Sequence, residues 1–313
     1  MTDYSRPMRR RFWQLAVLLL GMGSLLPGRA QAESVAITFD DLPLNGILAP
    51  GMTQAGITKD VLAILKKHRV PQVYGFINAS KLEGSADGAE ALRLWVAAGE
   101  RVGNHTYSHM DLHTNTAEEF LRDAYRDEPT LELLDRSDAW RWLRYPYLRE
   151  GDTLEKRQEV RARLRDRAYK IAQVTLDYED YLWNSAYARC VTKEDKDSIS
   201  WLRSSYLTTA SRYLDLDRQL ATMVFGREIS HVLLLHLGAF SSNILPDLLE
   251  LLRAKGFTLV TLEQAQSDPV YDSDPNGASR FGGSLLEQWM DVRALKYPTV
   301  AKKPYSELAA ICK

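Results

Sequence analysis

The sequence predicts an α/β fold in which a parallel sheet of about seven strands closes as a barrel. Short, mostly apolar segments alternate with longer segments whose apolar residues recur at helical spacing, which is typical of βα repeats. Reactive side chains follow the ends of at least five of the short segments. The carboxyl ends of barrel strands converge on one face, whereas a doubly wound sheet gathers ligands mainly near one switch point, so this distribution favours the barrel.

The elements are expected in regular order along the chain. Strands are predicted at 35–39, 73–77, 101–103, 142–145, 171–176, 232–235 and 257–260, and several are continuously apolar, as strands buried on both faces should be. Helices are predicted at 58–68, 86–98, 117–135, 154–168 and 244–255, the last ending at Lys255-Gly256. Residues 187–227 form a segment longer than one crossover connection needs, which predicts an insertion packed beside the functional site. Residues 267–283 predict a loop before a short amphipathic segment at 284–294.

Three parts are predicted: an export signal at 1–32, the barrel domain at 33–265 and a C-terminal extension at 266–313 packed on the barrel. The signal has several arginines, an apolar stretch and the small-residue site Ala30-Gln31-Ala32. This pattern predicts cleavage before Glu33 and an exported protein, periplasmic or secreted, with no stable membrane span left after cleavage.

Two alternatives concern the same segment. An uncleaved membrane anchor is one, although the apolar stretch contains Gln14 and is short for a span. Arg9-Arg10-Arg11-Phe12 loosely resembles a twin-arginine signal, which would export the protein already folded, so both export routes stay open.

Charge and cysteine content limit the classes of function. The first 32 residues hold five Arg and one Asp, so the remainder carries 35 basic and 40 acidic residues, a net charge of −5 without a basic tract. This balance does not favour nucleic acid as a partner. Cys190 and Cys312 either pair in an oxidising compartment or remain buried thiols, and their separation in sequence does not decide between the two.

A divalent metal site is predicted from two motifs. His105-Thr-Tyr-Ser-His109 places two imidazoles on one side of a helical turn, as a metal requires. The pair Asp40-Asp41 follows the first strand, so one carboxylate can complete the ligand set while the other takes a proton from a water at the metal. His113 is a rival ligand, and Asp111 is interpreted as a surface acid. Zinc is the default for mixed nitrogen and oxygen ligands, with Co²⁺, Ni²⁺, Mn²⁺ or Fe²⁺ as alternatives.

Later strand ends carry further reactive groups. Arg144 can keep a basic carboxylate ionised, and Pro146 can fix the backbone so that the amide of Tyr147 faces a developing oxyanion. Asp177 and Asp180 offer carboxylates that pair with Arg144 or orient a histidine.

The sixth strand ends in a histidine. His236 follows an apolar run, where it is well placed as a general acid. Leu234 falls on the same face of this strand and can pack against a small acyl methyl group.

Together these motifs resemble the polysaccharide deacetylases of the NodB-homology type, carbohydrate esterase family 4. The resemblance spans about residues 35–262 and rests on five ordered motifs: Thr38-Phe39-Asp40-Asp41, His105-Thr-Tyr-Ser-His109, Arg144-Tyr-Pro-Tyr147, Asp177-Tyr-Glu-Asp180-Tyr181 and Leu234-Leu-His236. It implies a distorted (β/α) barrel, similar to a TIM barrel but with fewer than eight complete units. It also implies metal-dependent hydrolysis of N-acetyl, or O-acetyl, groups on an envelope or extracellular amino-sugar polymer or oligomer.

The resemblance assigns roles to individual residues. It implies that Asp40 is the base and His236 the acid that protonates the leaving amine. It implies further that the metal ligands are Asp41, His105 and His109, that Arg144 and Asp180 tune the base and acid, and that Tyr147 donates its backbone amide. Candidate contacts to the sugar rings and acyl group are Tyr147, Leu234, Tyr181, Trp183 and Trp201.

Three positions depart from the family pattern. Leu42 stands where the family usually has Gly, which is expected to narrow the space beside the base. Tyr181 stands where Trp is usual, with Trp183 nearby, and Leu237 follows His236 in place of a polar residue. These departures border the expected sugar groove, so the substrate is less determined than the reaction.

Two other classes of function stay open. A non-catalytic carbohydrate-binding barrel would keep the fold, but such proteins tend to lose the base or a ligand. A non-heme iron oxygenase shares the set of two histidines and one carboxylate, yet it gives no role to Asp40, Arg144 or His236. The expected partner is an acetylated glycan, and the sequence leaves the identity of that glycan and the oligomeric state open.

Overall fold

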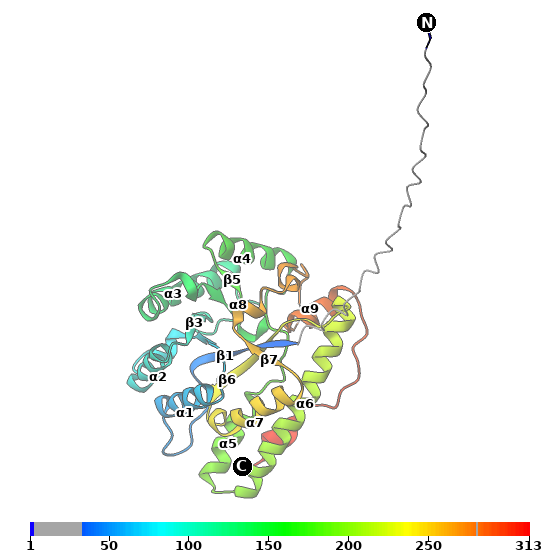
Figure 1. Ribbon diagram of the computed structural model, residues 1–313. Helices are drawn as coiled ribbons and strands as arrows, with labels where there is room; N and C mark the ends of the chain where they lie inside the picture. The colour runs from blue at the N-terminus through cyan, green and yellow to red at the C-terminus, as the bar shows by residue number, and fades with distance from the viewer. Residues whose placement is uncertain (3–32, 280) are drawn as a thin grey trace. The chain divides into compact units, whose positions relative to one another are not determined.

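The computed structural model describes residues 1–2, 33–279 and 281–313, and residues 33–313 belong to one compact unit (Figure 1). The predicted export signal falls almost entirely on 3–32 and so lies outside the described residues. In the compact unit, helices surround a central parallel sheet (Figure 1). No helix within the described ranges combines the length and the apolar character needed to cross a membrane.

The sheet has seven parallel strands. They are β1 (Ser34–Asn45), β2 (Tyr74–Ile77), β3 (Arg101–Asn104), β4 (Trp142–Leu143), β5 (Lys170–Ile171), β6 (His231–Gly238) and β7 (Thr258–Val260). Their order is β5-β4-β3-β2-β1-β6, and β7 pairs with the first residues of β1. The chain after β5 returns to β6 through a single parallel bridge between Leu176 and Leu233. The predicted distorted barrel of about seven strands is therefore confirmed.

Ten α-helices lie within the described residues. They are α1 (Gln54–Lys67), α2 (Ala86–Ala97), α3 (Ala117–Leu134), α4 (Leu154–Asp166), α5 (Leu182–Thr192), α6 (Lys196–Phe225), α7 (Ser241–Ala254), α8 (Leu262–Ala265), α9 (Leu285–Val292) and α10 (Tyr305–Ala310). Short 3₁₀ turns occupy η1 (Ala79–Leu82), η2 (Asp138–Trp140), η3 (Pro146–Leu148) and η4 (Pro269–Asp272). Six of these helices begin after a hydroxyl N-cap that accepts a backbone N–H, which fixes their start: Thr53, Ser85, Thr116, Thr153, Thr261 and Ser284.

Several strands differ from their predicted lengths, and β1 and β5 are two of them. The first strand continues six residues beyond 39, so Asp40 and Asp41 lie within β1; both carboxylates have polar partners, which allows charged residues to stay in a buried strand. The strand predicted at 171–176 shrinks to Lys170–Ile171. The carbonyl groups of Gln173 and Val174 accept hydrogen bonds from the C-terminal region in place of a neighbouring strand.

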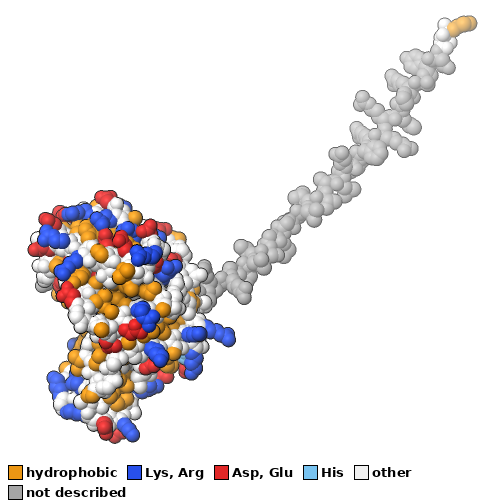
Figure 2. Space-filling model, turned by 90° about the vertical axis from the view of Figure 1, so that its left-hand side faces the viewer, with side chains coloured by type: hydrophobic (Ala, Val, Ile, Leu, Met, Phe, Trp, Pro, Cys, Tyr) orange, Lys and Arg blue, Asp and Glu red, His pale blue; other side chains and the backbone are white. Residues whose placement is uncertain are grey.

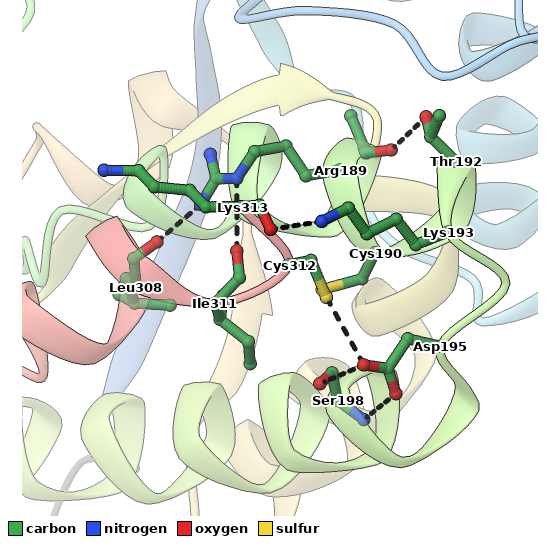
Figure 3. Close-up of a disulfide and its surroundings, with 11 residues drawn as sticks. Arg189, Cys190, Thr192, Lys193, Asp195, Ser198, Leu308, Ile311, Cys312 and Lys313 are labelled. Carbon is green, nitrogen blue, oxygen red and sulfur yellow. Dashed lines mark hydrogen bonds between the residues drawn. A yellow bond between two sulfur atoms is a disulfide. The ribbon is translucent and has the colours of Figure 1, made fainter.

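The region predicted as an insertion contains most of α5 and the 30-residue helix α6. The C-terminal residues lie against this region, because α9 packs on α6 and α10 packs on α5. A disulfide between Cys190, on α5, and Cys312 attaches the end of the chain to the same helix (Figure 3). On the face shown in Figure 2, acidic and basic side chains are interspersed over the surface.

Candidate functional site

The five sequence motifs meet at one cleft of about 530 Å³ on the carboxyl side of the sheet. The register of β1 and β6 places Asp40 opposite His236, and β3 leads directly into His105. Nine of the residues singled out in the sequence line this cleft: Asp40, Asp41, His105, His109, Tyr147, Asp177, Tyr181, Leu234 and His236.

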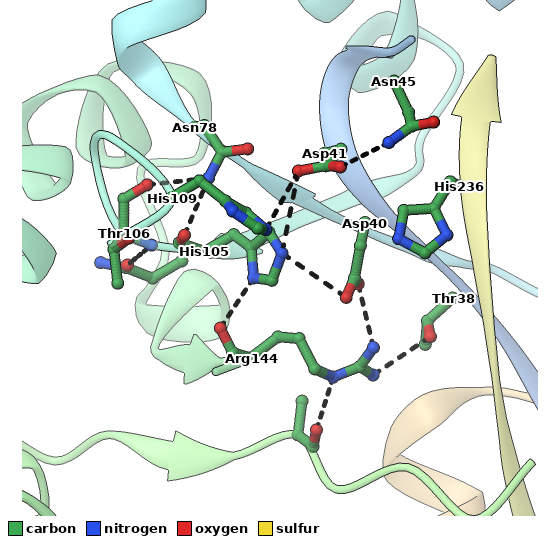
Figure 4. Close-up of polar contacts among 12 residues, drawn as sticks. Thr38, Asp40, Asp41, Asn45, Asn78, His105, Thr106, His109, Arg144 and His236 are labelled. Carbon is green, nitrogen blue, oxygen red and sulfur yellow. Dashed lines mark hydrogen bonds and ion pairs between the residues drawn. The ribbon is translucent and has the colours of Figure 1, made fainter. Parts of the chain in front are cut away.

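Asp41, His105 and His109 form a cluster with the geometry of a metal site (Figure 4). One ligand atom from each lies within 4.8 Å of the others, and Asp41 Oδ1 is 3.5 Å from His109 Nε2 and 3.9 Å from His105 Nε2. Asp41 Oδ1 is buried and accepts no hydrogen bond, although Lys81 forms an ion pair with it at 3.1 Å, while Asn45 donates to Oδ2 at 2.7 Å. A buried carboxylate oxygen that faces two imidazoles fits a divalent cation.

The two histidines are prepared for the same role. His105 Nδ1 lies 2.8 Å from the carbonyl oxygen of Arg144, so we assign the proton to Nδ1 and the free lone pair to Nε2. Burial lowers the pKa of both His105 and His109, and for His105 the nearby His109 lowers it further. Neutral imidazoles are the form that binds a metal.

The rival ligand His113 does not belong to this cluster among the residues that the structure describes. Asp111, interpreted from the sequence as a surface acid, instead forms an ion pair with Arg149, a lining residue of the cleft, and its side chain is largely buried. The interpretation as a surface acid was therefore wrong. The two partners are 38 positions apart in sequence, so no local pattern could predict their pairing.

Two residues that the motifs did not indicate hold Asp41 in place. Lys81 lies 3.1 Å from Asp41 Oδ1 and also donates to the backbone carbonyl groups of Asp41 and Leu44, at 3.1 and 3.2 Å. Although burial opposes ionisation, Lys81 and the neighbouring histidines lower the pKa of Asp41. Asn45 is the second missed residue. A single lysine on a 3₁₀ turn and a single asparagine form no motif with a recognisable spacing. Their contacts with Asp41 are therefore seen only in the tertiary structure.

Asp40 is held by Arg144 and lies beside the metal cluster. Arg144 donates from Nη1 to Asp40 Oδ1 at 2.9 Å, from Nη2 to Thr38 Oγ1 at 3.1 Å and from Nε to the Ala172 carbonyl at 2.6 Å. Asp40 Oδ2 remains directed towards His105 Nε2, at 3.6 Å (Figure 4). Burial raises the pKa of Asp40 to about 6, against the opposing effect of the Arg144 charge. The carboxylate is therefore a stronger base than an exposed aspartate.

His236 approaches Asp40 from β6 and is held by Asp180. Asp180 accepts hydrogen bonds from His236 Nδ1 at 2.7 Å and from its backbone N–H at 2.9 Å. Burial alone would lower the pKa of His236, but the Asp180 carboxylate outweighs it and the net pKa is about 9. The imidazole is thus protonated near neutral pH, with Nδ1 directed to Asp180.

The residues expected to contact substrate divide into two groups. Tyr147, Tyr181 and Leu234 line the cleft; the Tyr147 ring lies against His109 and the Tyr181 ring against His236, with centroid distances of 4.5 and 5.2 Å. Tyr147 has a φ of 58°, so its backbone turns sharply after Pro146.

Three expectations about the groove are corrected. Trp183 is 0% exposed and donates to Ser205, so it belongs to the core and cannot touch a sugar ring. Trp201 lines a separate hollow along α6. Leu42 is also buried and packs over Gly75, away from the cleft, so it does not narrow the space beside Asp40.

Residues 28–172 match the polysaccharide deacetylase family. Over 116 residues, 37% of this chain and 47% of the relative, the chain is 31% identical to a chitooligosaccharide deacetylase of Sinorhizobium fredii. Over 48% of this chain and 54% of the relative, it is 28% identical to a chitin deacetylase of Colletotrichum lindemuthianum. The chain thus spans about half the length of these curated relatives.

Solved structures share the fold. The chitin deacetylase of Colletotrichum lindemuthianum superposes with a TM-score of 0.52 at 22% identity, covering 75% of this chain and 88% of that one. A carbohydrate esterase family 4 pseudoenzyme of Bacillus anthracis superposes with a TM-score of 0.51 at 16% identity, covering 75% of this chain and 66% of that one. Such a likeness supports the barrel and leaves the chemistry to the site itself.

Proposed function

We propose that this chain, whose residues 28–172 match the polysaccharide deacetylase family, is a metal-dependent hydrolase that removes N-acetyl groups from an amino-sugar polymer or oligomer. The observation that carries the proposal is one cleft in which a base held by Arg144, a three-residue metal cluster and a protonated histidine face one another. O-acetyl groups are a close variant, because the same groups can attack an ester.

Asp41, His105 and His109 would hold the divalent metal. A cation bound there would supply positive charge that lowers the pKa of a water and polarises the acetyl carbonyl. Zinc is the metal that this mixed ligand set suits first. We also propose that the protein is exported, on the pattern of its first 32 residues.

The protein's own side chains handle the protons. Asp40 Oδ1 is engaged by Arg144, so Oδ2 takes the proton from the attacking water. The water oxygen adds to the acetyl carbon, and the C–N bond then breaks. His236 gives the leaving nitrogen its proton from Nε2, because Nδ1 is bonded to Asp180. The products are acetate and a free amine.

The proposal is tested by acetate release from N-acetylated glycans, including chitooligosaccharides, peptidoglycan, poly-N-acetylglucosamine and acetyl-xylan. We expect release from at least one substrate, loss of that release with a chelator, and recovery when a divalent metal is added. Absence of release from every substrate by the metal-loaded protein would overturn the proposal.

The metal ligands have a matched control in the same segment. His109→Ala should lose stoichiometric metal, measured by elemental analysis, together with activity, because it removes one of three ligands. His113→Ala, four positions further on, should keep both. Equal metal content in the two variants would contradict the assigned ligand set.

The other two classes fit the cleft less well. A non-catalytic barrel would not need a buried Arg144 and Asp40 pair beside a complete ligand set, since buried ion pairs are costly to maintain. An iron oxygenase would have no use for the pair formed by His236 and Asp180. Oxygen consumption with a reduced co-substrate, in place of acetate release, is the result that would favour it.

A further inference from the structure

The cleft has an acidic wall that the proposed chemistry does not use. Asp177 follows the bridge to β6, Asp217 lies on α6 and Glu287 lies on α9, and all three line the same cleft as the metal cluster. Figure 1 shows α9 beside α6, so this wall is assembled from the region after β5, the long helix and the C-terminal extension.

Asp217 is the central member of this wall. It is 6% exposed, yet its Oδ2 atom has no hydrogen-bond partner and it lines the cleft. Its carboxyl group accepts a hydrogen bond from the backbone N–H of Asp177. A buried carboxyl oxygen without a partner costs free energy unless a ligand satisfies it.

The neighbouring carboxylates add negative charge to the buried surroundings of Asp217. Burial, and then the carboxylates of Glu287 and Asp177, raise the pKa of Asp217 well above its usual range. Burial likewise raises the pKa of Asp177 to about 6, with Glu287 adding to the effect. A cation placed among the three groups would relieve both the burial and the repulsion.

The nearby lysine is already engaged. Lys303 Nζ lies 2.8 Å from Glu179 Oε2 and 4.5 Å from the centre of the Tyr213 ring, and it forms no ion pair shorter than 4.0 Å with the three acids. It lowers the pKa of Asp177 and Asp217 only through space. Lys303 therefore lies at the edge of the acidic wall without pairing with its three carboxyl groups, and a second cation could pair with them.

We propose that Asp177, Asp217 and Glu287 form a subsite for the ammonium group of an already deacetylated amino-sugar unit. An ammonium carries a positive charge and hydrogen-bond donors, so it can pair with the unpartnered oxygen of Asp217. Among the described residues the three acids are not grouped within 4.8 Å as Asp41, His105 and His109 are, so Asp177 and Glu287 act on that ammonium through their charge. Tyr213 and Tyr297 also line the cleft and provide apolar surface for the sugar rings.

This inference rests on the proposed deacetylase function and narrows its substrate. A polymer in which some units are already free amines would place an ammonium on the acidic wall and an acetylated unit at the metal cluster. The protein would then act preferentially on partially deacetylated chains, and each turnover would create a further cationic unit that the wall can bind.

The test compares two oligosaccharides of equal length, one fully N-acetylated and one carrying a single free amine. We expect kcat/KM to be about tenfold higher for the amine-bearing oligomer, the difference that roughly 1.4 kcal/mol of ion pairing would produce. In Asp217→Asn and in Glu287→Gln the ratio of the two kcat/KM values should fall to near one. The control Asp60→Asn removes the same charge from the exposed face of α1 and should keep the wild-type ratio.

Binding separates this proposal from the catalytic one. Calorimetric titration of the wild-type protein with a fully deacetylated oligomer should show binding that weakens about tenfold in both variants and in raised salt, since ion pairing is screened. Active wild-type protein with equal kcat/KM values for the two oligomers would overturn the subsite and leave the deacetylase proposal standing. Inactive protein that still binds the amine oligomer through Asp217 would support the subsite alone, and inactive protein without such binding would overturn both.

Discussion

At the residue scale, Asp40 and Asp41 are adjacent in sequence but differ sharply in environment. Asp40 is bound by Arg144 in the barrel interior, and its pKa is raised by burial to about 6. Asp41 faces two imidazoles and Lys81, which lower its pKa. The regular alternation of β1 is interrupted here, because Asp41 has a φ of 68° and the register with β6 shifts after Asp40, so both carboxylates reach the cleft but meet different neighbours. These different neighbours fit the roles proposed for them, Asp40 as the base and Asp41 as a ligand.

Asp40→Asn tests the assigned base directly. The amide can still accept the Arg144 hydrogen bond, but it cannot take a proton, so kcat should fall by about 10²- to 10⁴-fold. Metal content should stay at the wild-type level, because Asp40 is not a member of the ligand cluster. A variant that keeps near wild-type kcat would remove Asp40 from the mechanism.

Asp180→Asn tests the tuning of His236 through the pH profile. His236 must be protonated to act as the acid, so activity is lost as the pH rises through its pKa, near 9 in the wild-type protein. Removing the Asp180 charge should lower that pKa, and the alkaline limb of kcat/KM should move down by about one to two pH units. A uniform loss of activity with an unmoved limb would indicate a purely structural role.

At the scale of the elements, the site depends on close approach between neighbouring strands. Gly103 on β3 immediately precedes Asn104 and His105. A Cβ atom at Gly103 would lie 2.9 Å from the Trp142 carbonyl oxygen on β4 and 2.6 Å from the Phe76 ring on β2. Glycine is therefore required where three strands pack side by side behind the metal cluster.

Gly103→Ala should destabilise the protein by about 1 to 3 kcal/mol, because backbone and a buried ring must shift to admit the methyl group. Urea denaturation with the slope held constant measures this change in the free energy of unfolding. An unchanged midpoint would mean that β2 and β4 can move apart without cost, which would contradict the packing described here.

At the scale of the whole molecule, the C-terminal region forms part of the lining of the cleft. Glu287, Tyr297 and Lys303 line the cleft, and Lys303 and Tyr305 both donate to Glu179, one residue before Asp180. The disulfide between Cys190 and Cys312 holds the end of this region against α5 (Figure 3). The boundary expected at 265 separates two stretches of sequence that build one site.

Cys312→Ser should lower the free energy of unfolding by about 2 to 4 kcal/mol, since the disulfide closes a long segment of 122 positions. Wild-type protein unfolded in the presence of a reductant should show the same lowered midpoint, and the variant should not respond to the reductant. Equal midpoints for wild-type protein with and without reductant would show that the bond contributes no stability.

The sequence by itself determined the class of fold and the positions of the reactive groups. Both follow from local patterns: helical and strand periodicities set the order of elements, and Asp40, His105, Arg144 and His236 each follow an apolar strand segment. A parallel sheet then brings strand ends together, so the residues meet without further information.

Only the tertiary structure decided which side chains surround that set. Lys81 beside Asp41, the burial of Trp183 and Leu42, the pairing of Cys190 with Cys312 and the acidic wall around Asp217 all depend on contacts between elements far apart in sequence. Such contacts leave no period or spacing in the chain, because they are set by how the long helix and the C-terminal region pack on the sheet. Local sequence patterns thus predict the reacting groups. The side chains that would select the substrate depend on tertiary packing.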